Sequence, residues 1–266
     1  MRGVRAAAYL TLVAAARAAE SAARLLAHAA AGLVRLDELR ASILEEWRAS
    51  GAHESDRYIL AGLMAWEREF YGRFLRATDR VLLVGCGTGR DLIALLEQGY
   101  RADGLDVVPE CVETARRLVR ERGLSASVHA GELGSVTLPT RYDAVVFSWC
   151  CYGLIPHAEH RIATLRQAAA ALGPGGRILL TYALAAAVPP RPLRATQLIA
   201  RLSRSDWRPE PGDLLQLSGR RRGLARYSHT FDPPELEAEA RAADLHLLHH
   251  GADEHGLAVL SPRGAP

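Results

Sequence analysis

Three glycines stand at alternate positions in residues 81–91, VLLVGCGTGRD, directly after a short apolar run. Glycine has no Cβ, so Gly85, Gly87 and Gly89 allow a ligand to lie against the main chain itself. The order G-x-G-x-G puts Arg90 where a dinucleotide site has its last glycine, which fits poorly with a pyrophosphate. G-K-[ST] is also missing, so the loop is not a P-loop. The motif indicates a site for a different small ligand.

An acid follows this glycine loop at a second predicted strand end. Asp106 lies 17 residues after Gly89, within the apolar segment ADGLDVV. A carboxylate at the carboxyl end of a strand can accept hydrogen bonds from both hydroxyls of a ribose. The alternative is a surface aspartate that caps the next helix. The position and residue type favour the ribose interpretation.

Aromatic residues provide candidate substrate contacts. Trp149 and Tyr152, in SWCCYGLIPH, can enclose an apolar substrate or hold a cationic amine by cation–π contact. Ordinary packing beneath N-terminal helices is the alternative. Tyr58 and Trp66, which precede the glycine loop, are two further candidates.

No metal site is expected. Four histidines lie near the C-terminus: His246, His249, His250 and His255. They straddle a predicted strand and its turn, and adjacent histidines do not easily converge on one ion. The four cysteines show no spacing typical of a disulfide framework or a zinc site, which favours free thiols in a reducing cytosol.

The elements that position these residues alternate between strand and helix from Arg80 onward. Apolar runs predict seven strands: RVLLVG, ADGLDVV, SASVHA, YDAVVFSW, GRILLTYAL, LHLLHHG and GLAVLSP. Helical segments such as PECVETARRLVRERG lie between them. The pattern predicts an α/β fold, a doubly wound Rossmann-like domain with a seven-stranded, mostly parallel sheet.

Two segments depart from this alternation. Residues 1–78 predict an N-terminal helical cap, followed by the main domain over residues 79–266. Residues 186–226, rich in arginine, proline and glycine, predict a lid-like insertion after the fifth strand, or a solvated loop. Arg220, Arg221 and Arg222 in this insertion suit a carboxylate or phosphate on a substrate.

Net charge and composition limit the classes of partner and the catalytic residues that the chain can use. The net charge of +3 gives no argument for a nucleic-acid or membrane partner, and no apolar run approaches the ~18 residues of a membrane span. Arg17 and Glu20 continue a helical pattern, so we interpret the apolar start as an amphipathic helix rather than a targeting signal, and expect a cytoplasmic protein. All 33 basic residues are arginine, which excludes a catalytic lysine.

Five segments in order resemble the motifs of class I S-adenosylmethionine-dependent methyltransferases: VLLVGCGTGRD, GLDVVPECVETAR, VHAGEL, YDAVVFSW and LGPGGRILL. HTFDPPELEAEARAADLHL is similar to a late element of the family's small-molecule members. The resemblance covers residues 56–261. It implies S-adenosylmethionine as cofactor and S-adenosylhomocysteine as product.

The resemblance also implies the residues that bind the cofactor. Asp106 would hold the ribose, Glu132 the adenine amino group, and Ser148 would face the sulfonium. The whole implied set is Gly85, Cys86, Gly87, Thr88, Gly89, Asp91, Asp106, Val107, Glu132, Leu133 and Ser148. The family commonly has an acid two residues before the first glycine, where this chain has Leu83. Asp91 or backbone carbonyls of the loop are the candidates to hold the methionine ammonium instead.

The implied chemistry is in-line methyl transfer, in which placement and water exclusion do much of the work. His229 lies where small-molecule members often have a histidine, so His229 and Tyr152 are the candidate catalytic residues, and both are candidate substrate contacts. A lone histidine is, however, more often structural.

The implied function is methylation of oxygen or nitrogen on a small molecule by a monomer or homodimer. The alternatives are thiol or halide methylation, and a catalytically silent cofactor-binding protein. Nucleic acid is not an expected partner, because no [DN]-P-P-[FYW] element follows the fourth strand.

Overall fold

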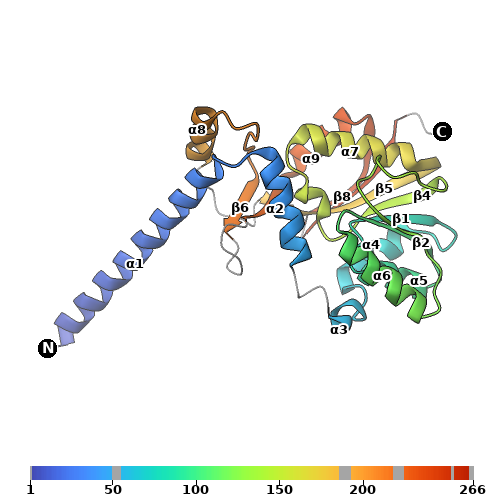
Figure 1. Ribbon diagram of the computed structural model, residues 1–266, viewed down its shortest axis with the longest axis horizontal. Helices are drawn as coiled ribbons and strands as arrows, with labels where there is room; N and C mark the ends of the chain where they lie inside the picture. Colours follow the sequence, from blue (N-terminus) through green and yellow to red (C-terminus); the bar gives the residue numbers. More distant parts are fainter. Residues whose placement is uncertain (1, 50–54, 186–192, 218–224, 253–254, 264–266) are drawn as a thin grey trace.

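The structure is a computed structural model that describes residues 2–49, 55–185, 193–217, 225–252 and 255–263 (Figure 1). A sheet runs through the main body and is flanked by helices on both faces. The described strands are β1 (Arg80–Val84), β2 (Arg101–Asp106), β3 (Val128–Ala130), β4 (Tyr142–Phe147), β5 (Leu172–Leu184), β6 (Asp213–Leu217), β7 (Ala225–Phe231), β8 (Leu245–Ala252) and β9 (Gly256–Pro262). The predicted Rossmann-like α/β fold class is confirmed.

The strands β3-β2-β1-β4-β5 are hydrogen-bonded neighbours in that order, and all are parallel. Their carboxyl ends therefore meet at one edge of the sheet. Strand β9 pairs antiparallel with both β5 and β8 and extends the sheet beyond β5.

The predicted number of strands was wrong, because the described residues form nine strands rather than seven. The two additional strands, β6 and β7, form an antiparallel pair; β6 lies inside the segment that was predicted to be an insertion, and β7 begins at the end of that segment and continues beyond it. β7 joins β5 through only two parallel pairs, Ala183 with Thr230 and Leu184 with Phe231. Parts of the same segment, residues 186–192 and 218–224, lie outside the described residues.

Helices cover the sheet and extend beyond it. They are α1 (Arg2–Ala31), α2 (Leu36–Arg48), α3 (Asp56–Ile59), α4 (Ala65–Phe74), α5 (Arg90–Glu97), α6 (Pro109–Glu121), α7 (Ala158–Ala171), α8 (Leu193–Ser203) and α9 (Pro233–Ala242), with a 3₁₀ turn, η2 (Cys151–Leu154). The local sequence determines where two of these helices begin. Pro109 opens α6, and the side chain of Asp232 accepts a hydrogen bond from the Glu235 N–H to cap α9.

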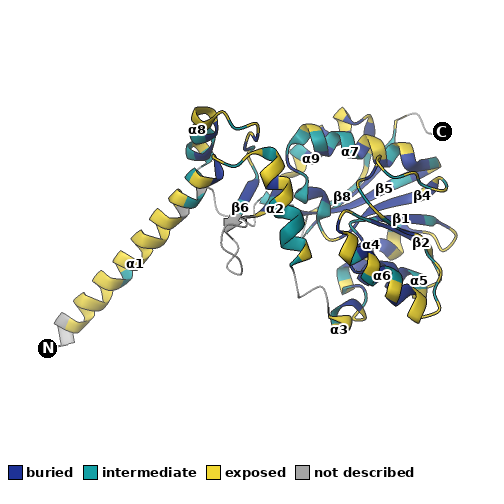
Figure 2. Cartoon of the chain, in the orientation of Figure 1, coloured by how far each residue is buried: buried dark blue, intermediate teal, exposed yellow. Residues whose placement is uncertain are grey.

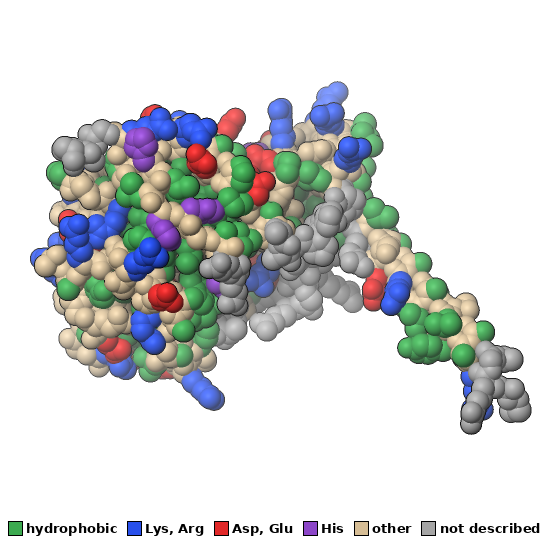
Figure 3. All heavy atoms as spheres, turned by 180° about the vertical axis from the view of Figure 1, so that it is seen from behind, with side chains coloured by type: hydrophobic (Ala, Val, Ile, Leu, Met, Phe, Trp, Pro, Cys, Tyr) green, Lys and Arg blue, Asp and Glu red, His purple; other side chains and the backbone are tan. Residues whose placement is uncertain are grey.

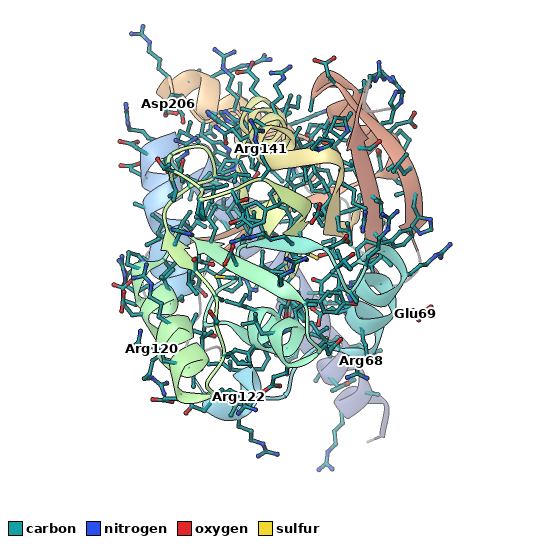
Figure 4. The ribbon with its side chains drawn as sticks, turned by 90° about the vertical axis from the view of Figure 1, so that its right-hand side faces the viewer. Arg68, Glu69, Arg120, Arg122, Arg141 and Asp206 are labelled. Atoms are coloured by element: carbon teal, nitrogen blue, oxygen red, sulfur yellow. The ribbon has the colours of Figure 1, made fainter. Side chains whose placement is uncertain are left out.

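Alternating residues of β1 bury their side chains in two separate cores, as the period of two along a strand requires. Val81 and Leu83 belong to the core shared with α4, α5 and α6. Leu82 belongs to the opposite core, shared with α7 and α9. Figure 2 shows the resulting buried centre of the sheet. In Figure 4, the charged side chains of Arg68, Glu69 and Arg120 lie at the periphery of this body.

The N-terminal helices occupy different positions. Figure 1 shows α1 projecting away from the body, with its C-terminal end beside α8. Its free length carries exposed apolar side chains, including Tyr9, Leu10 and Leu12, and Figure 3 shows hydrophobic side chains along it. Among the described residues, no helix combines the length and apolar character needed to cross a bilayer. The division at residue 78 stays a prediction.

Candidate functional site

A cavity of about 500 Å³ lies at the carboxyl ends of β1, β2 and β4. Loops after these strands form its floor, and residues of α2 and α7 also line it. The predicted cofactor residues that line this cavity are Gly85, Cys86, Gly87, Thr88, Asp91, Asp106, Val107, Glu132, Leu133 and Ser148. The structure thus brings together ten of the eleven, Gly89 being the exception.

The glycine loop presents bare backbone to this cavity. Gly85, Gly87 and Gly89 have φ angles of 72°, 53° and 101°, a region that L side chains rarely adopt. A Cβ on Gly85 would lie 2.7 Å from the Cys151 sulfur. A Cβ on Gly87 would meet no described atom within 4 Å, so the open space beside this residue leaves room for a ligand.

Asp106 ties the glycine loop to the end of β2. One carboxylate oxygen accepts from the Gly87 N–H at 2.8 Å, and the other accepts from the Val108 N–H at 2.8 Å. Burial raises the pKa of Asp106 above its ordinary value, and these backbone hydrogen bonds oppose the increase. The carboxylate is therefore fixed in orientation, and each oxygen keeps a lone pair for a ligand.

A buried ionic cluster lies where the glycine loop becomes α5. The Arg90 guanidinium contacts the carboxylates of Glu67, from α4, and Asp91. The Arg90 side chain is 9% exposed and that of Glu67 is 0% exposed. Burial raises the pKa of Glu67, and the charge of Asp91 adds to the increase. Burial alone would lower the pKa of Arg90, but Asp91 and Glu67 raise it, so the guanidinium stays charged.

Asp91 joins this cluster to the end of β4. Its second carboxylate oxygen accepts from the Ser148 hydroxyl at 2.7 Å and from the Tyr71 hydroxyl at 3.4 Å. Asp91 does not cap α5, because Gly89 is the N-cap of this helix and no side chain caps it. Glu67 was missed by the sequence analysis, and nothing in its local pattern marks it as a site residue.

Two of the predicted aromatic contacts surround Arg90. Its guanidinium carbon lies 5.1 Å from the ring centroid of Trp149 and 5.7 Å from that of Tyr58. Both aromatic residues line the cavity. Trp66 is not part of the lining, but its ring lies 6.4 Å from that of Trp149 and 4.8 Å from that of His255. The rings of Tyr58 and Trp149 therefore contact a cation that belongs to the protein, the Arg90 guanidinium.

Helix α2 contributes residues that the sequence analysis did not assign. Arg40, Ile43, Leu44 and Trp47 all line the cavity. Their spacing of three, four and seven residues places them on one face of the helix, a pattern already visible in the sequence. At one end of this face, an Arg40 nitrogen lies 3.3 Å from Nδ1 of His160, which begins α7 and also lines the cavity.

The two candidate catalytic residues lie outside the cavity lining. Tyr152, on η2, is fully buried and donates its hydroxyl hydrogen to Glu239 at 2.6 Å. His229 lies on β7, with Nδ1 at 2.7 Å from Asp213 and Nε2 at 3.0 Å from Glu235. The structure does not bring either side chain to the space in which a ligand would lie.

A buried polar network includes both residues. Arg161 contacts Glu239 and Glu210, and so connects α7, α9 and the segment before β6. Burial lowers the pKa of His229, but its hydrogen bonds to Asp213 and Glu235 raise it overall. This geometry fits a structural role for the network.

The described residues contain one group with the geometry of a metal site, formed by Glu210, Asp213 and His229. Arg161 already contacts Glu210, and Asp213 already contacts His229. The C-terminal histidines do not gather into such a group within the described residues. Burial raises the pKa of the Cys150 thiol to about 11, which agrees with an inert thiol. The predicted arginines at 220–222 lie outside the described residues.

Comparisons with known proteins agree with this site. The family described as "Methyltransferase domain" matches residues 81–176. The chain is 30% identical over 170 residues to a ubiquinone biosynthesis O-methyltransferase of Xylella fastidiosa, covering 63% of this chain and 61% of that protein. It is 32% identical over 123 residues to a cypemycin N-terminal methyltransferase of a Streptomyces species, covering 45% and 47%. The match therefore spans between about half and three fifths of these relatives.

Solved structures share the fold. A SAM-dependent methyltransferase from Methanosarcina mazei aligns with a TM-score of 0.57 and 17% identity. The alignment covers 76% of this chain and 98% of that one.

Proposed function

We propose that this chain is a class I S-adenosylmethionine-dependent methyltransferase that transfers a methyl group to oxygen or nitrogen of a small molecule, as the methyltransferase domain matched over residues 81–176 and the curated relatives support. The observation that carries the proposal is the oriented Asp106 carboxylate beside the open face of Gly87, within one cavity. The names of the two curated relatives, an O-methyltransferase and an N-terminal methyltransferase, support both acceptor atoms. The acceptor is a small molecule, and no nucleic-acid partner is included in the proposal.

The residues at the strand ends fit the cofactor of this family. Asp106 takes the ribose hydroxyls with the oxygen lone pairs that Gly87 and Val108 leave open. Glu132 and Leu133, which line the far side after β3, take the adenine. The bare glycine loop accommodates the part of the cofactor between ribose and methionine.

The ionic cluster binds the methionine part of S-adenosylmethionine in this proposal. Leu83 is fully buried in the core and makes no polar contact with a ligand. We assign Arg90 to the methionine carboxylate and Asp91, which also lines the cavity, to the ammonium, while the fully buried Glu67 holds the Arg90 guanidinium in place. These residues replace the acid that the family commonly has two positions before the first glycine.

S-adenosylmethionine supplies the electrophilic methyl group when it is bound. The protein's contribution is placement: Ser148, held by Asp91, fixes the end of β4, while Trp149 and the face of α2 exclude water. Neither His229 nor Tyr152 lines the cavity, so the proposed mechanism assigns them no proton transfer. An acceptor that arrives already deprotonated needs no base.

Titration calorimetry with S-adenosylhomocysteine tests the cofactor site. We expect the native protein to bind it, and Asp106→Asn to bind at least about tenfold more weakly, because charge-assisted hydrogen bonds to the ribose are weakened. Glu237→Gln, on the exposed face of α9, is the matched control and should bind as the native protein does.

Three results would contradict the proposal. Absence of binding by the native protein, with its fold intact by circular dichroism, would exclude the cofactor assignment. Binding without methyl transfer to any oxygen or nitrogen acceptor in a substrate panel would favour the silent cofactor-binding protein. Transfer to thiols or halides alone would favour that alternative.

A further inference from the structure

The inner face of α2 is apolar along most of its length and ends in a positive charge. Ile43 and Leu44 lie between Trp47 at one end and Arg40 at the other, and all four line the cavity. Seven residues of helix separate the two ends, which corresponds to about 10 Å. A ligand that matches this face has an elongated apolar body with a polar group at one end.

The charge at Arg40 is not neutralised by a protein carboxylate. Among the described residues, Arg40 takes part in no ion pair, and its hydrogen-bond partner is Nδ1 of His160 at 3.3 Å. The other cavity arginine, Arg90, is bound by two carboxylates, and the proposed function already assigns it to the methionine end of the cofactor. Arg40 is therefore the cation in the described cavity wall that remains to balance charge on a ligand.

His160 adds a second donor at the same place. A guanidinium only donates hydrogen bonds, so Nδ1 of His160 accepts and the ring is neutral, with its hydrogen on Nε2. Burial lowers the pKa of His160, and the charge of Arg40 lowers it further, which favours this neutral form. Arg40 and the Nε2–H group together suit an oxygen anion.

A cationic ligand finds no equivalent partner. Three acids line the cavity: Asp91, Asp106 and Glu132. Asp91 is bound to Arg90, and the proposed function uses all three acids for the cofactor. The aromatic rings of Tyr58 and Trp149 that would hold an ammonium already lie against Arg90.

We propose that the part of the cavity beneath α2 binds a methyl acceptor with an apolar body and an anionic end, and that the anion lies at Arg40 and His160. The methyl-accepting atom then lies toward Ser148 and Trp149. The inference rests on the proposed function, because it assigns the acceptor half of the same cavity.

Three probes of equal length test this assignment: 4-phenylbutyrate, 4-phenylbutylamine and 4-phenylbutanol. Each is titrated calorimetrically into the protein saturated with S-adenosylhomocysteine. We expect the carboxylate to bind at least about tenfold more tightly than the amine, with the alcohol between them, because a charged hydrogen bond at a partly exposed site is worth this much.

Variants on α2 locate the anion. Arg40→Gln should remove the preference for the carboxylate and leave binding of S-adenosylhomocysteine unchanged. Arg48→Gln is the matched control, since Arg48 lies on the same helix, pairs with Glu45 and Glu110, and does not line the cavity. Leu44→Ala should weaken all three probes alike, because it shortens the apolar face.

The outcomes separate this inference from the proposed function. Equal or tighter binding of the amine, no binding of any probe, or the same loss in Arg48→Gln as in Arg40→Gln would overturn the inference. In each case, retained binding of S-adenosylhomocysteine would leave the cofactor site intact. Failure to bind S-adenosylhomocysteine would instead overturn the proposed function.

Discussion

At the residue scale, Arg90 makes both ionic and aromatic contacts at the cavity. Its side chain is nearly buried, and it is bound by Glu67 and Asp91 while two aromatic rings of the cavity lie against it. A buried ionic cluster is seldom worth its desolvation cost for stability alone. Its position at the end of the glycine loop supports the proposed second use, which is to hold the charged methionine end of the cofactor.

Replacing Arg90 tests this use with two nucleosides. Arg90→Gln should weaken binding of S-adenosylhomocysteine by about tenfold or more, because a charged partner for the carboxylate is lost. It should leave the affinity for 5′-methylthioadenosine unchanged, since that molecule keeps the adenosine part but lacks the α-amino and α-carboxyl groups of the amino-acid part. Calorimetry on the native protein, Arg90→Gln and the control Arg73→Gln measures both. Equal loss for both nucleosides would contradict the assignment and indicate a collapsed loop.

Part of this site could be predicted from the sequence because its residues are contiguous or recur at strand ends. The glycines and Asp106 belong to this group. The link between Glu67 and Arg90, 23 residues apart, depends on how α4 packs against the sheet, and no local pattern contains that information. The same limit explains His229, whose place in the family resemblance suggested catalysis but whose position on β7 gives both ring nitrogens carboxylate partners.

At the scale of elements, the buried polar network around Arg161 and Glu239 fixes the position of the segment after β4. Tyr152 of η2 donates to Glu239 of α9, and Gly153 is packed so closely that a Cβ would lie 2.6 Å from the His229 carbonyl oxygen. This segment carries Trp149 at the cavity. The network of α7, α9, β6 and β7 thus positions the loop without contacting a ligand.

His229 makes this network sensitive to pH. Its pKa is raised on folding above the ordinary 6.5, so the protonated ring stabilises the fold. That stability is fully present below about pH 6.5 and is lost as pH rises through the folded value. The free energy of unfolding should therefore fall with increasing pH, with a limiting slope of about 1.4 kcal/mol per pH unit. Asp213, Glu235 and Arg161 are the charged groups that face the ring.

Urea unfolding of the native protein and two variants between pH 6 and 9 measures this effect. His229→Gln should lack the decrease, whereas His246→Gln, at an exposed position of β8, should retain it. An identical pH profile for the native protein and His229→Gln would show that the ring does not carry its proton in the folded state.

Seven of the strands could be predicted from the sequence, whereas β6 and β7 could not. Strands such as β1 and β4 were identified because burial on both faces leaves a continuous apolar run. β6 and β7 were missed because they lie among arginine and proline and pair mainly with each other. The α2 face was visible in the helical period of Arg40, Ile43, Leu44 and Trp47, but only the fold shows that a cavity lies beneath it.

On the scale of the whole molecule, the chain is divided between a packed body and a helix that leaves it. The side chains of residues 5–20 of α1 are exposed, apart from a half-buried Val13, whereas Leu39 of α2 is fully buried. Only the C-terminal end of α1 is fixed, where Ser203 of α8 donates a hydrogen bond to the Gly32 carbonyl at 3.0 Å. Helix α2 therefore contributes to the stability of the fold, whereas most of α1 contributes little.

Deletion of residues 5–20 should consequently leave both the free energy of unfolding and the affinity for S-adenosylhomocysteine unchanged, because the removed side chains contribute little to either core. Leu39→Ala should instead lower the free energy of unfolding by about 2–5 kcal/mol, since it opens a cavity beneath α2. Urea unfolding and calorimetry on the three proteins measure the contrast. A loss above about 1 kcal/mol on deletion would contradict this view, because exposed surface contributes so much only when something covers it in solution.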